Sequence, residues 1–207
     1  MLNIWFASGN IHKKKELASI LSDAILRIPS EAGLVFDPDE NGNSFLENAL
    51  IKARALYDLL EKHRPQLYKN GDPVIADDSG LCVDALGGKP GILSARYGGK
   101  DLDAAEKNLL LINETRDSSV RSARFVCAMV LYYGPDRFFV AQECLEGELV
   151  KNPDAVRGSG GFGYDPILYI PELGRTVAEL SAEEKNRLSH RGKAGRAISK
   201  ILQENLL

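Results

Sequence analysis

The chain has 207 residues, of which 44% are hydrophobic and 27% charged, a composition typical of a globular protein and not of a disordered chain. Its net charge of −3, from 26 basic and 29 acidic residues, excludes an overall basic surface for non-specific nucleic-acid binding. This length predicts one domain or two closely joined lobes.

The cysteines and the apolar runs indicate a reducing compartment. Cys82, Cys127 and Cys144 are odd in number and show no CxxC spacing, so we expect free thiols. The first residues lack the basic region of a signal peptide. The longest unbroken apolar run, 125–133, is nine residues long and falls short of the ~18 that span a bilayer. We expect a cytoplasmic protein without membrane contact.

The start of the chain predicts a strand, a glycine turn and a helix. Residues 2–7 form an apolar run typical of a buried strand, and residues 13–21 show the apolar spacing of a helix. A second strand is expected at 24–28. Strands that alternate with helices in this way favour α/β architecture.

The next elements are a long helix and a short strand. Ser44 and Glu47 have the spacing of a capping box, and apolar residues follow at helical spacing as far as Leu60. Residues 73–76 predict a strand that ends at the pair Asp77-Asp78.

The second half predicts an irregular glycine-rich segment at 81–99, a helix at 103–114 and a hairpin. The hairpin strands, 122–133 and 138–149, flank Gly-Pro-Asp at 134–136, which is a turn signal.

The remaining elements are a brief strand at 166–170, a capping box from Ser181 to Glu184 and a last helix that buries Ile198, Ile201 and Leu202. Together the elements predict a mixed α/β fold, with a mixed central sheet and flanking helices.

The first turn, residues 8–13, reads Ser-Gly-Asn-Ile-His-Lys. A glycine turn at a helix N-terminus presents free backbone N–H groups and the positive end of the helix dipole, which suit an anion. Its spacing is not that of a Walker loop. An ordinary turn with solvated lysines explains the same residues equally well.

Adjacent carboxylates at Asp77 and Asp78, followed by Ser79 and Gly80, suit a hard cation with oxygen ligands. Two neighbouring aspartates repel, so one should have a raised pKa unless a metal or a cationic group is near. The alternative is a simple Asx turn. The glycine- and proline-rich continuation at 81–91 favours an ordered loop that folds over a ligand.

The stretch 158–163 matches GxGxxG by letter, but Asp165-Pro166 disfavours the helix that a dinucleotide site requires. We expect instead a loop that lets the backbone and Phe162 or Tyr164 approach a planar ligand. A flexible connection is the alternative.

Lys185, His190 and Arg191 precede or begin the last helix and could bind phosphate and a base edge. A structural His and solvated cations are the plainer interpretation. Either Glu40 or Glu47 could complete a metal site with Asp78, although the capping box already explains Glu47.

Six blocks in chain order, between residues 8 and 191, together resemble the inosine/xanthosine triphosphate pyrophosphatase (Ham1-like) family. They are Ser-Gly-Asn-X-X-Lys, Ser-Phe-Leu-Glu-Asn-Ala, Asp-Asp-Ser-Gly-Leu with Leu-Gly-Gly-X-Pro-Gly, Ser-Ala-Arg-Tyr, Gly-Gly-Phe-Gly-Tyr-Asp-Pro and Glu-Lys-Asn-X-X-Ser-His-Arg. Ile11 and His12 stand where the family often has small residues; this position mainly presents backbone.

The resemblance implies an elongated α/β fold with two lobes around a nucleotide cleft, a homodimer, and Mg²⁺-dependent cleavage of ITP, dITP or XTP to the monophosphate and pyrophosphate. It makes Asp78 the catalytic acid–base residue and a metal ligand, and Glu40 the second metal ligand. The substrate-binding residues it implies are Ser8, Gly9, Asn10, Ile11, His12, Lys13, Ser79, Phe162, Gly163, Tyr164, Asp165, Lys185, His190 and Arg191.

To bind a 6-oxo purine and reject ATP, the site needs a hydrogen-bond donor that faces the O6 atom of the base. Adenine carries an amino group at this position, which is itself a donor, so the two donors would face each other without a hydrogen bond. Arg191 is the expected donor, with His190 beside it. Two alternatives stay open: a Maf-like pyrophosphatase of pyrimidine or modified nucleotides, and a nucleotide sensor without catalysis.

Overall fold

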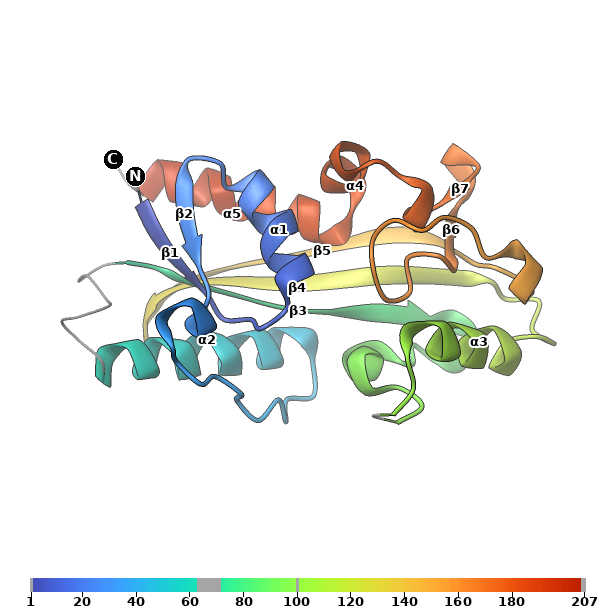
Figure 1. Cartoon of the computed structure of the whole chain (residues 1–207), viewed down its shortest axis with the longest axis horizontal. Coiled ribbons are helices and arrows are strands. Elements are labelled where there is room, and N and C mark those ends of the chain that lie inside the picture. The colour runs from blue at the N-terminus through green and yellow to red at the C-terminus, as the bar shows by residue number, and fades with distance from the viewer. Residues whose placement is uncertain (1, 63–71, 100, 206–207) are drawn as a thin grey trace. The chain divides into compact units, whose positions relative to one another are not determined.

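The computed structural model describes residues 2–62, 72–99 and 101–205 (Figure 1). Internal contacts divide the chain into two units. The first unit comprises Met1–Asp78, Cys127–Glu143 and Arg191–Leu207, and the second comprises Ser79–Val126 and Cys144–His190. Among the described residues the strands form one seven-stranded sheet in the order β2-β1-β3-β4-β5-β6-β7.

The first unit begins with parallel strands, as the sequence predicts. β1 (Leu2–Phe6) pairs in parallel with β2 (Ala24–Arg27) on one side and with β3 (Val74–Val83) on the other. The helix α1 (Ile11–Ile20) connects β1 to β2, because parallel neighbours need a crossover that returns the chain to the same end of the sheet.

Two further helices belong to the first unit: α2 (Phe45–Lys62) and α5 (His190–Asn205), of which all but His190 lies in it. The predicted capping box of α2 is half formed. The Glu47 N–H donates to Ser44 Oγ at 3.1 Å, but the Glu47 carboxylate accepts from the backbone of Asn43 instead of Ser44.

Helices cover both faces of the sheet in this unit (Figure 1). Ile4 and Phe6 pack in a cluster with residues of α1 and α5, whereas Trp5 packs with residues of α2. The alternation follows from strand geometry, since successive side chains point to opposite faces. The start of β3 follows the same alternation: Ile75 belongs to the cluster of α1 and α5, and Val74 and Ala76 belong to that of α2.

The second unit contains the helices α3 (Ala104–Glu114) and α4 (Ala182–Leu188) and the short strands β6 (Leu168–Ile170) and β7 (Arg175–Thr176). Its apolar core includes Leu81, Leu111, Phe125, Leu145 and Ile167. Short 3₁₀ helices lie at Pro29–Ala32, Asp84–Leu86, Gly91–Arg96, Pro153–Ala155, Pro171–Leu173 and Val177–Glu179.

The predicted hairpin is β4 (Ser122–Gly134) and β5 (Arg137–Leu149), adjacent in the sheet and joined by two residues. The glycine cluster at 158–163 leads into a turn and then β6, and not directly into a helix, so the rejection of a dinucleotide fingerprint there is confirmed. The predicted mixed α/β fold is confirmed.

The prediction that the strand at 73–76 ends before Asp77 is wrong. β3 continues through Asp77, Asp78, Ser79 and Gly80 to Val83. Gly80 is required by close approach and not by a turn: a Cβ there would lie 2.3 Å from Ser94 Oγ and 2.4 Å from the Gly91 carbonyl. A glycine within a strand commonly marks such an approach.

The three cysteines are free, as predicted; Cys127 is buried, and Cys82 and Cys144 are partly exposed. Within the described ranges, the helices are all too short or too polar to cross a membrane.

We predict that Gly80→Ala lowers the free energy of unfolding by ~1–3 kcal/mol, because the new methyl group overlaps the Gly91 backbone and Ser94. Urea denaturation monitored by circular dichroism measures this loss. Gly9→Ala is the control, since nothing lies within 4 Å of a Cβ at Gly9. Equal stability of the two variants would contradict the packing of Gly80.

Candidate active site

The two adjacent aspartates lie on opposite faces of β3. Asp77 lies two residues after Ile75, so its side chain is on the same face of β3 and points to the layer of α1 and α5. The Asp78 side chain is on the opposite face and points to α2. Both are buried, with 1% and 7% of their surface exposed. The pair therefore forms two separate sites, each with its own partners.

Asp77 forms buried ion pairs with two cations. Lys13 Nζ lies 3.0 Å from Asp77 Oδ2, and Arg191 Nε lies 3.1 Å from the same oxygen. Burial raises the pKa of Asp77, but the charges of Lys13 and Arg191 outweigh it and hold this pKa well below its usual range. Burial lowers the pKa of Lys13, against the opposing charge of Asp77. The repulsion expected between neighbouring aspartates is thus compensated by cations.

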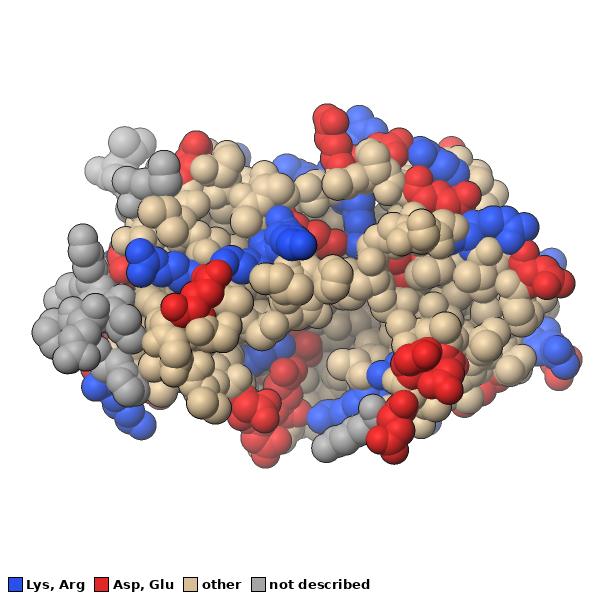
Figure 2. Space-filling model, viewed as in Figure 1, with Lys and Arg blue, Asp and Glu red and all other residues tan. Residues whose placement is uncertain are grey.

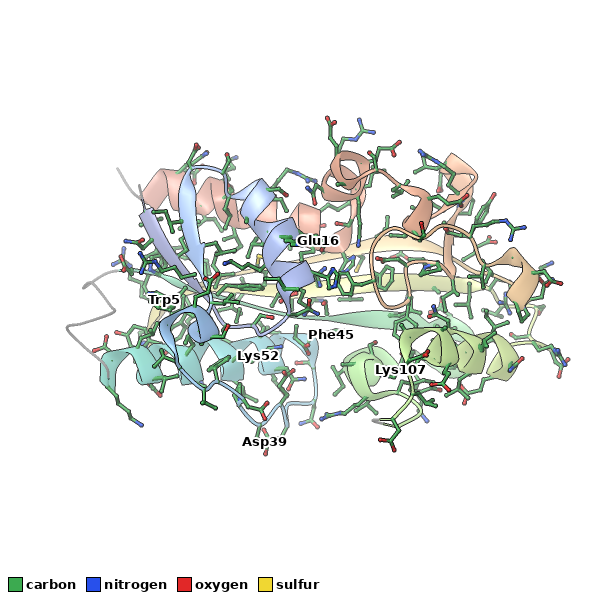
Figure 3. All side chains as sticks on the ribbon, viewed as in Figure 1. Trp5, Glu16, Asp39, Phe45, Lys52 and Lys107 are labelled. Atoms are coloured by element: carbon green, nitrogen blue, oxygen red, sulfur yellow. The ribbon has the colours of Figure 1, made fainter. Side chains whose placement is uncertain are left out.

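Asp78 is held by two residues of α2. Asn48 Nδ2 donates to Asp78 Oδ2 at 3.0 Å, and Lys52 Nζ lies 3.5 Å from Oδ1. Lys52, labelled in Figure 3, also lies 3.1 Å from Glu40 Oε2. Burial opposes the charge on Lys52, but Asp78, Asp77 and Glu40 outweigh it and raise its pKa.

Lys52 is a central residue of this arrangement that the sequence analysis missed. Asn48 and Lys52 are spaced i, i+4 beside the apolar stripe of α2 and so share a face of the helix. Both are buried, and a buried Lys is uncommon without a partner. The signal was therefore a pair of polar residues next to a stripe that should face the core.

Glu40 and Glu47 differ in their surroundings. Glu40 reaches Lys52 and so stands beside the same ammonium group as Asp78, whereas Glu47 accepts from Asn43 at the start of α2. In the described part of the chain no three His, Cys, Asp or Glu side chains gather as a metal site. Two carboxylates nevertheless fit Mg²⁺, which binds one or two of them and fills its remaining positions with water and phosphate oxygens.

The first turn is capped more fully than the sequence suggested. The Asn10 side chain accepts from the backbone N–H groups of His12 and Lys13, and Ser8 Oγ accepts from Asn10 N. The prediction that this turn leaves its N–H groups free is therefore wrong for these three. Gly9, Ile11 and His12 are exposed, whereas the Lys13 ammonium group lies on Asp77.

In the second unit, Asp165 organises the glycine-rich loop. Its Oδ2 accepts from Phe162 N at 2.7 Å and from Lys185 Nζ at 2.7 Å. The same ammonium group lies 4.8 Å from the centre of the Phe162 ring, a cation–π distance. Gly161 has φ +71°, and a Cβ there would lie 2.0 Å from Asp165 Oδ2, so the loop can close on this carboxylate only with glycine.

The Tyr164 and His190 side chains pack in the second unit instead of extending from it. Tyr164 Oη donates to the Ser94 carbonyl at 2.8 Å, and burial raises the pKa of Tyr164 to about 12. The His190 ring stacks on Phe125 with 4.9 Å between the ring centres. Gly163 accepts a hydrogen bond from Asn108 through its carbonyl.

Each unit thus gathers its own share of the predicted residues. The first unit brings Lys13 and Arg191 together at Asp77 and places Glu40 and Asp78 at Lys52. The second unit brings together Phe162, Asp165 and Lys185, while Ser79, half-buried, is its first residue.

Comparisons with known proteins agree with one another. Residues 4–201 match the model of the Ham1 family. A dITP/XTP pyrophosphatase of Treponema denticola is 44% identical over 98% of this chain and 99% of its own, and one of Pectobacterium atrosepticum is 44% identical over the same shares. The solved Staphylococcus aureus Ham1 protein superposes with a TM-score of 0.83 at 37% identity, covering 98% of this chain and 99% of that one.

We predict that Asp77→Asn lowers the free energy of unfolding by ~3–5 kcal/mol at neutral pH, because it leaves buried cations without their counter-charge. The pKa of Asp77 in the folded chain lies below the ~3.9 of the unfolded chain. Its stabilisation is therefore complete above that value and declines as the pH falls toward the folded-state pKa.

Denaturant unfolding at several pH values between 7 and 3 measures this difference between wild type and variant, which should narrow only in the acidic samples. Glu31→Gln, which removes an exposed ion pair with Lys14, is the control and should cost at most ~1 kcal/mol. A difference that stays constant with pH would contradict the assignment.

Proposed function

The chain belongs to the Ham1 family, and we propose that it hydrolyses ITP, dITP and XTP to the nucleoside monophosphate and pyrophosphate with Mg²⁺. The observation that carries the proposal is the buried Asp78 carboxylate beside Lys52 and Glu40. The names of the relatives, dITP/XTP pyrophosphatase, supply the substrate class. Such an enzyme would remove non-standard purines from the nucleotide pool.

Asp78 and Glu40 would hold the metal. Mg²⁺ at these carboxylates would neutralise charge on the phosphate oxygens. Lys52 Nζ contacts both carboxylates and so marks the place where their negative charges converge. Glu47 is the weaker candidate, because its carboxylate caps the start of α2.

Asp78 would also accept the proton of the attacking water. The Asn48 amide, 3.0 Å from Oδ2, fixes the orientation of the carboxylate. A carboxylate so held is a suitable general base if the water lies within hydrogen-bond reach. Lys13 and Lys52 would stabilise the negative charge that develops on the departing pyrophosphate.

The second unit would bind the base. The Phe162 ring offers a stacking surface, Lys185 offers a charged donor beside it, and Ser79 and the loop backbone at Gly163 offer further contacts. Arg191, the expected donor for O6, already donates through Nε to Asp77 and through Nη1 to Glu16. If it donates to the base, it does so through another of its N–H groups.

We further propose a cytoplasmic homodimer that binds neither nucleic acid nor membranes. On the face shown in Figure 2, basic and acidic side chains are interspersed and form no continuous basic area. The free cysteines fit a reducing compartment. The homodimer rests on resemblance to the family and is tested by light scattering.

We predict that with Mg²⁺ the protein releases pyrophosphate from ITP, dITP and XTP far faster than from ATP. A panel of triphosphates, with pyrophosphate and orthophosphate measured separately, tests this. Faster turnover of UTP or dTTP would support the Maf-like alternative. Measurable ITP binding without turnover would support a sensor.

In the same assay Asp78→Asn should lower turnover by ~10²–10⁴-fold, the usual contribution of a general acid or base. Near-normal turnover by a folded Asp78→Asn variant would remove Asp78 from the mechanism. Circular dichroism establishes that the variant is folded.

We also predict different effects for the two candidate metal glutamates. Glu40→Gln should raise the Mg²⁺ concentration for half-maximal activity by at least about tenfold, because a carboxylate ligand is lost. Glu47→Gln should leave this concentration nearly unchanged, because the glutamine carbonyl oxygen can still accept from Asn43 N at the start of α2. The reverse order of effects would assign the metal to Glu47.

A further inference from the structure

Asp77 belongs to a set of four charges in the first unit, linked by three ion pairs; we call it the ring because its two end members lie on one helix. Lys13 and Glu16 come from α1, Asp77 from β3 and Arg191 from α5. Lys13 Nζ contacts Asp77, Asp77 accepts from Arg191 Nε, and Arg191 Nη1 donates to Glu16 at 2.6 Å. Because Lys13 and Glu16 are three residues apart on one helix, the ring ends on the element where it began.

The ring constrains α1 at two points of one face, since residues spaced i, i+3 are neighbours on a helix surface. Glu16, labelled in Figure 3, projects from α1. Two positive and two negative charges balance within the ring. A rotation of α1 about its axis would break the contact with Asp77 or the contact of Glu16 with Arg191, so the ring fixes the direction in which Lys13 extends.

Within the ring, the Asp77 side chain is more deeply buried than the Lys13 side chain. The Asp77 side chain is 0% exposed, and the Lys13 side chain that lies on it is 15% exposed. Asp77 is therefore shielded by Lys13 and cannot itself meet a ligand, whereas Lys13 can. Its ammonium group carries three N–H donors; both Asp77 oxygens lie within 3.2 Å of Nζ and leave at least one donor for an anion.

We propose that Asp77 is a positioning residue, which acts through Lys13 by holding its ammonium group in place to bind a phosphate of the substrate. The inference rests on the proposed function, in which Lys13 contacts the triphosphate. Asp77 is thereby distinguished from its neighbour Asp78, which would touch the metal and the water. A charged donor fixed before binding loses less conformational entropy when the ligand arrives.

Inorganic tripolyphosphate is the probe, because it presents phosphates without a base. Its dissociation constant is measured by calorimetry for wild type, Asp77→Asn, Lys13→Met and the double variant. We expect each single substitution to weaken binding by about tenfold, the effect of losing one well-placed charged hydrogen bond. We expect the double variant to bind as Lys13→Met does, because Asp77 has no effect once Lys13 is absent.

Additive losses in the double variant would overturn the proposal, since they would mean that Asp77 acts on binding without Lys13 or through stability alone. An unchanged affinity in Asp77→Asn would overturn it as well. Glu31→Gln is the matched control: it removes the acidic partner of Lys14, the next lysine of α1, and should leave the affinity unchanged.

If Asp77→Asn does not fold, Asp77→Glu takes its place in the same cycle, because it keeps the charge and displaces the carboxylate by one methylene group. We expect several-fold weaker binding, which again disappears with Lys13→Met. Wild-type affinity in Asp77→Glu would overturn the proposal.

The turnover of ITP by the wild-type protein distinguishes a failure of the role proposed for Asp77 from a failure of the proposed function. Tripolyphosphate binding with the expected cycle but without ITP turnover would sustain the role of Asp77 and contradict the proposed reaction. Wild-type protein that turns over ITP but does not bind tripolyphosphate would overturn the role of Asp77 and leave the reaction standing.

Discussion

Adjacent residues of a strand point in opposite directions, and in β3 this geometry separates Asp77 from Asp78. One carboxylate meets the cations of α1 and α5, and the other meets the amide and ammonium groups of α2. A turn at this point would have let the two acids share a single ion. The continuous strand instead gives each acid different partners, so the chemistry proposed for Asp78 does not require the two acids to share an ion.

Buried charges are maintained here by mutual compensation. Ionised groups in a protein interior are costly unless they are paired and hydrogen-bonded, and Asp77 and Lys52 each contact two groups of opposite charge. A bound triphosphate would bring negative charge to the lysines, and a divalent cation would bring positive charge to the carboxylates. The same lysines that stabilise the folded unit would therefore serve the ligand, which ties the stability of this region to binding.

The sequence predicted the elements well, because their signals are local. Apolar spacing located the helices, and the turn residues located the hairpin. It predicted β3 poorly, since Asp-Ser-Gly resembles a turn and Gly80 owes its identity to Ser94 and Gly91, which are distant in the chain. The partners of the two aspartates could likewise not be predicted, because no local sequence pattern indicates that Lys52 contacts Asp78 or that Arg191 contacts Asp77.

Ser94 shows why separate sequence blocks belong together. Its hydroxyl accepts from Leu81 N at 2.9 Å and donates to the Gly91 carbonyl at 2.7 Å, while its own carbonyl accepts from Tyr164 Oη. The two parts of the third block, around residues 80 and 90, and the fifth block, around residue 164, are thus joined at one small residue of the fourth. A substitution in any of them would disturb the contacts of the others. Through these hydrogen bonds Ser94 supports the segments that carry Ser79 and the Phe162 loop, even though Ser94 touches no proposed ligand.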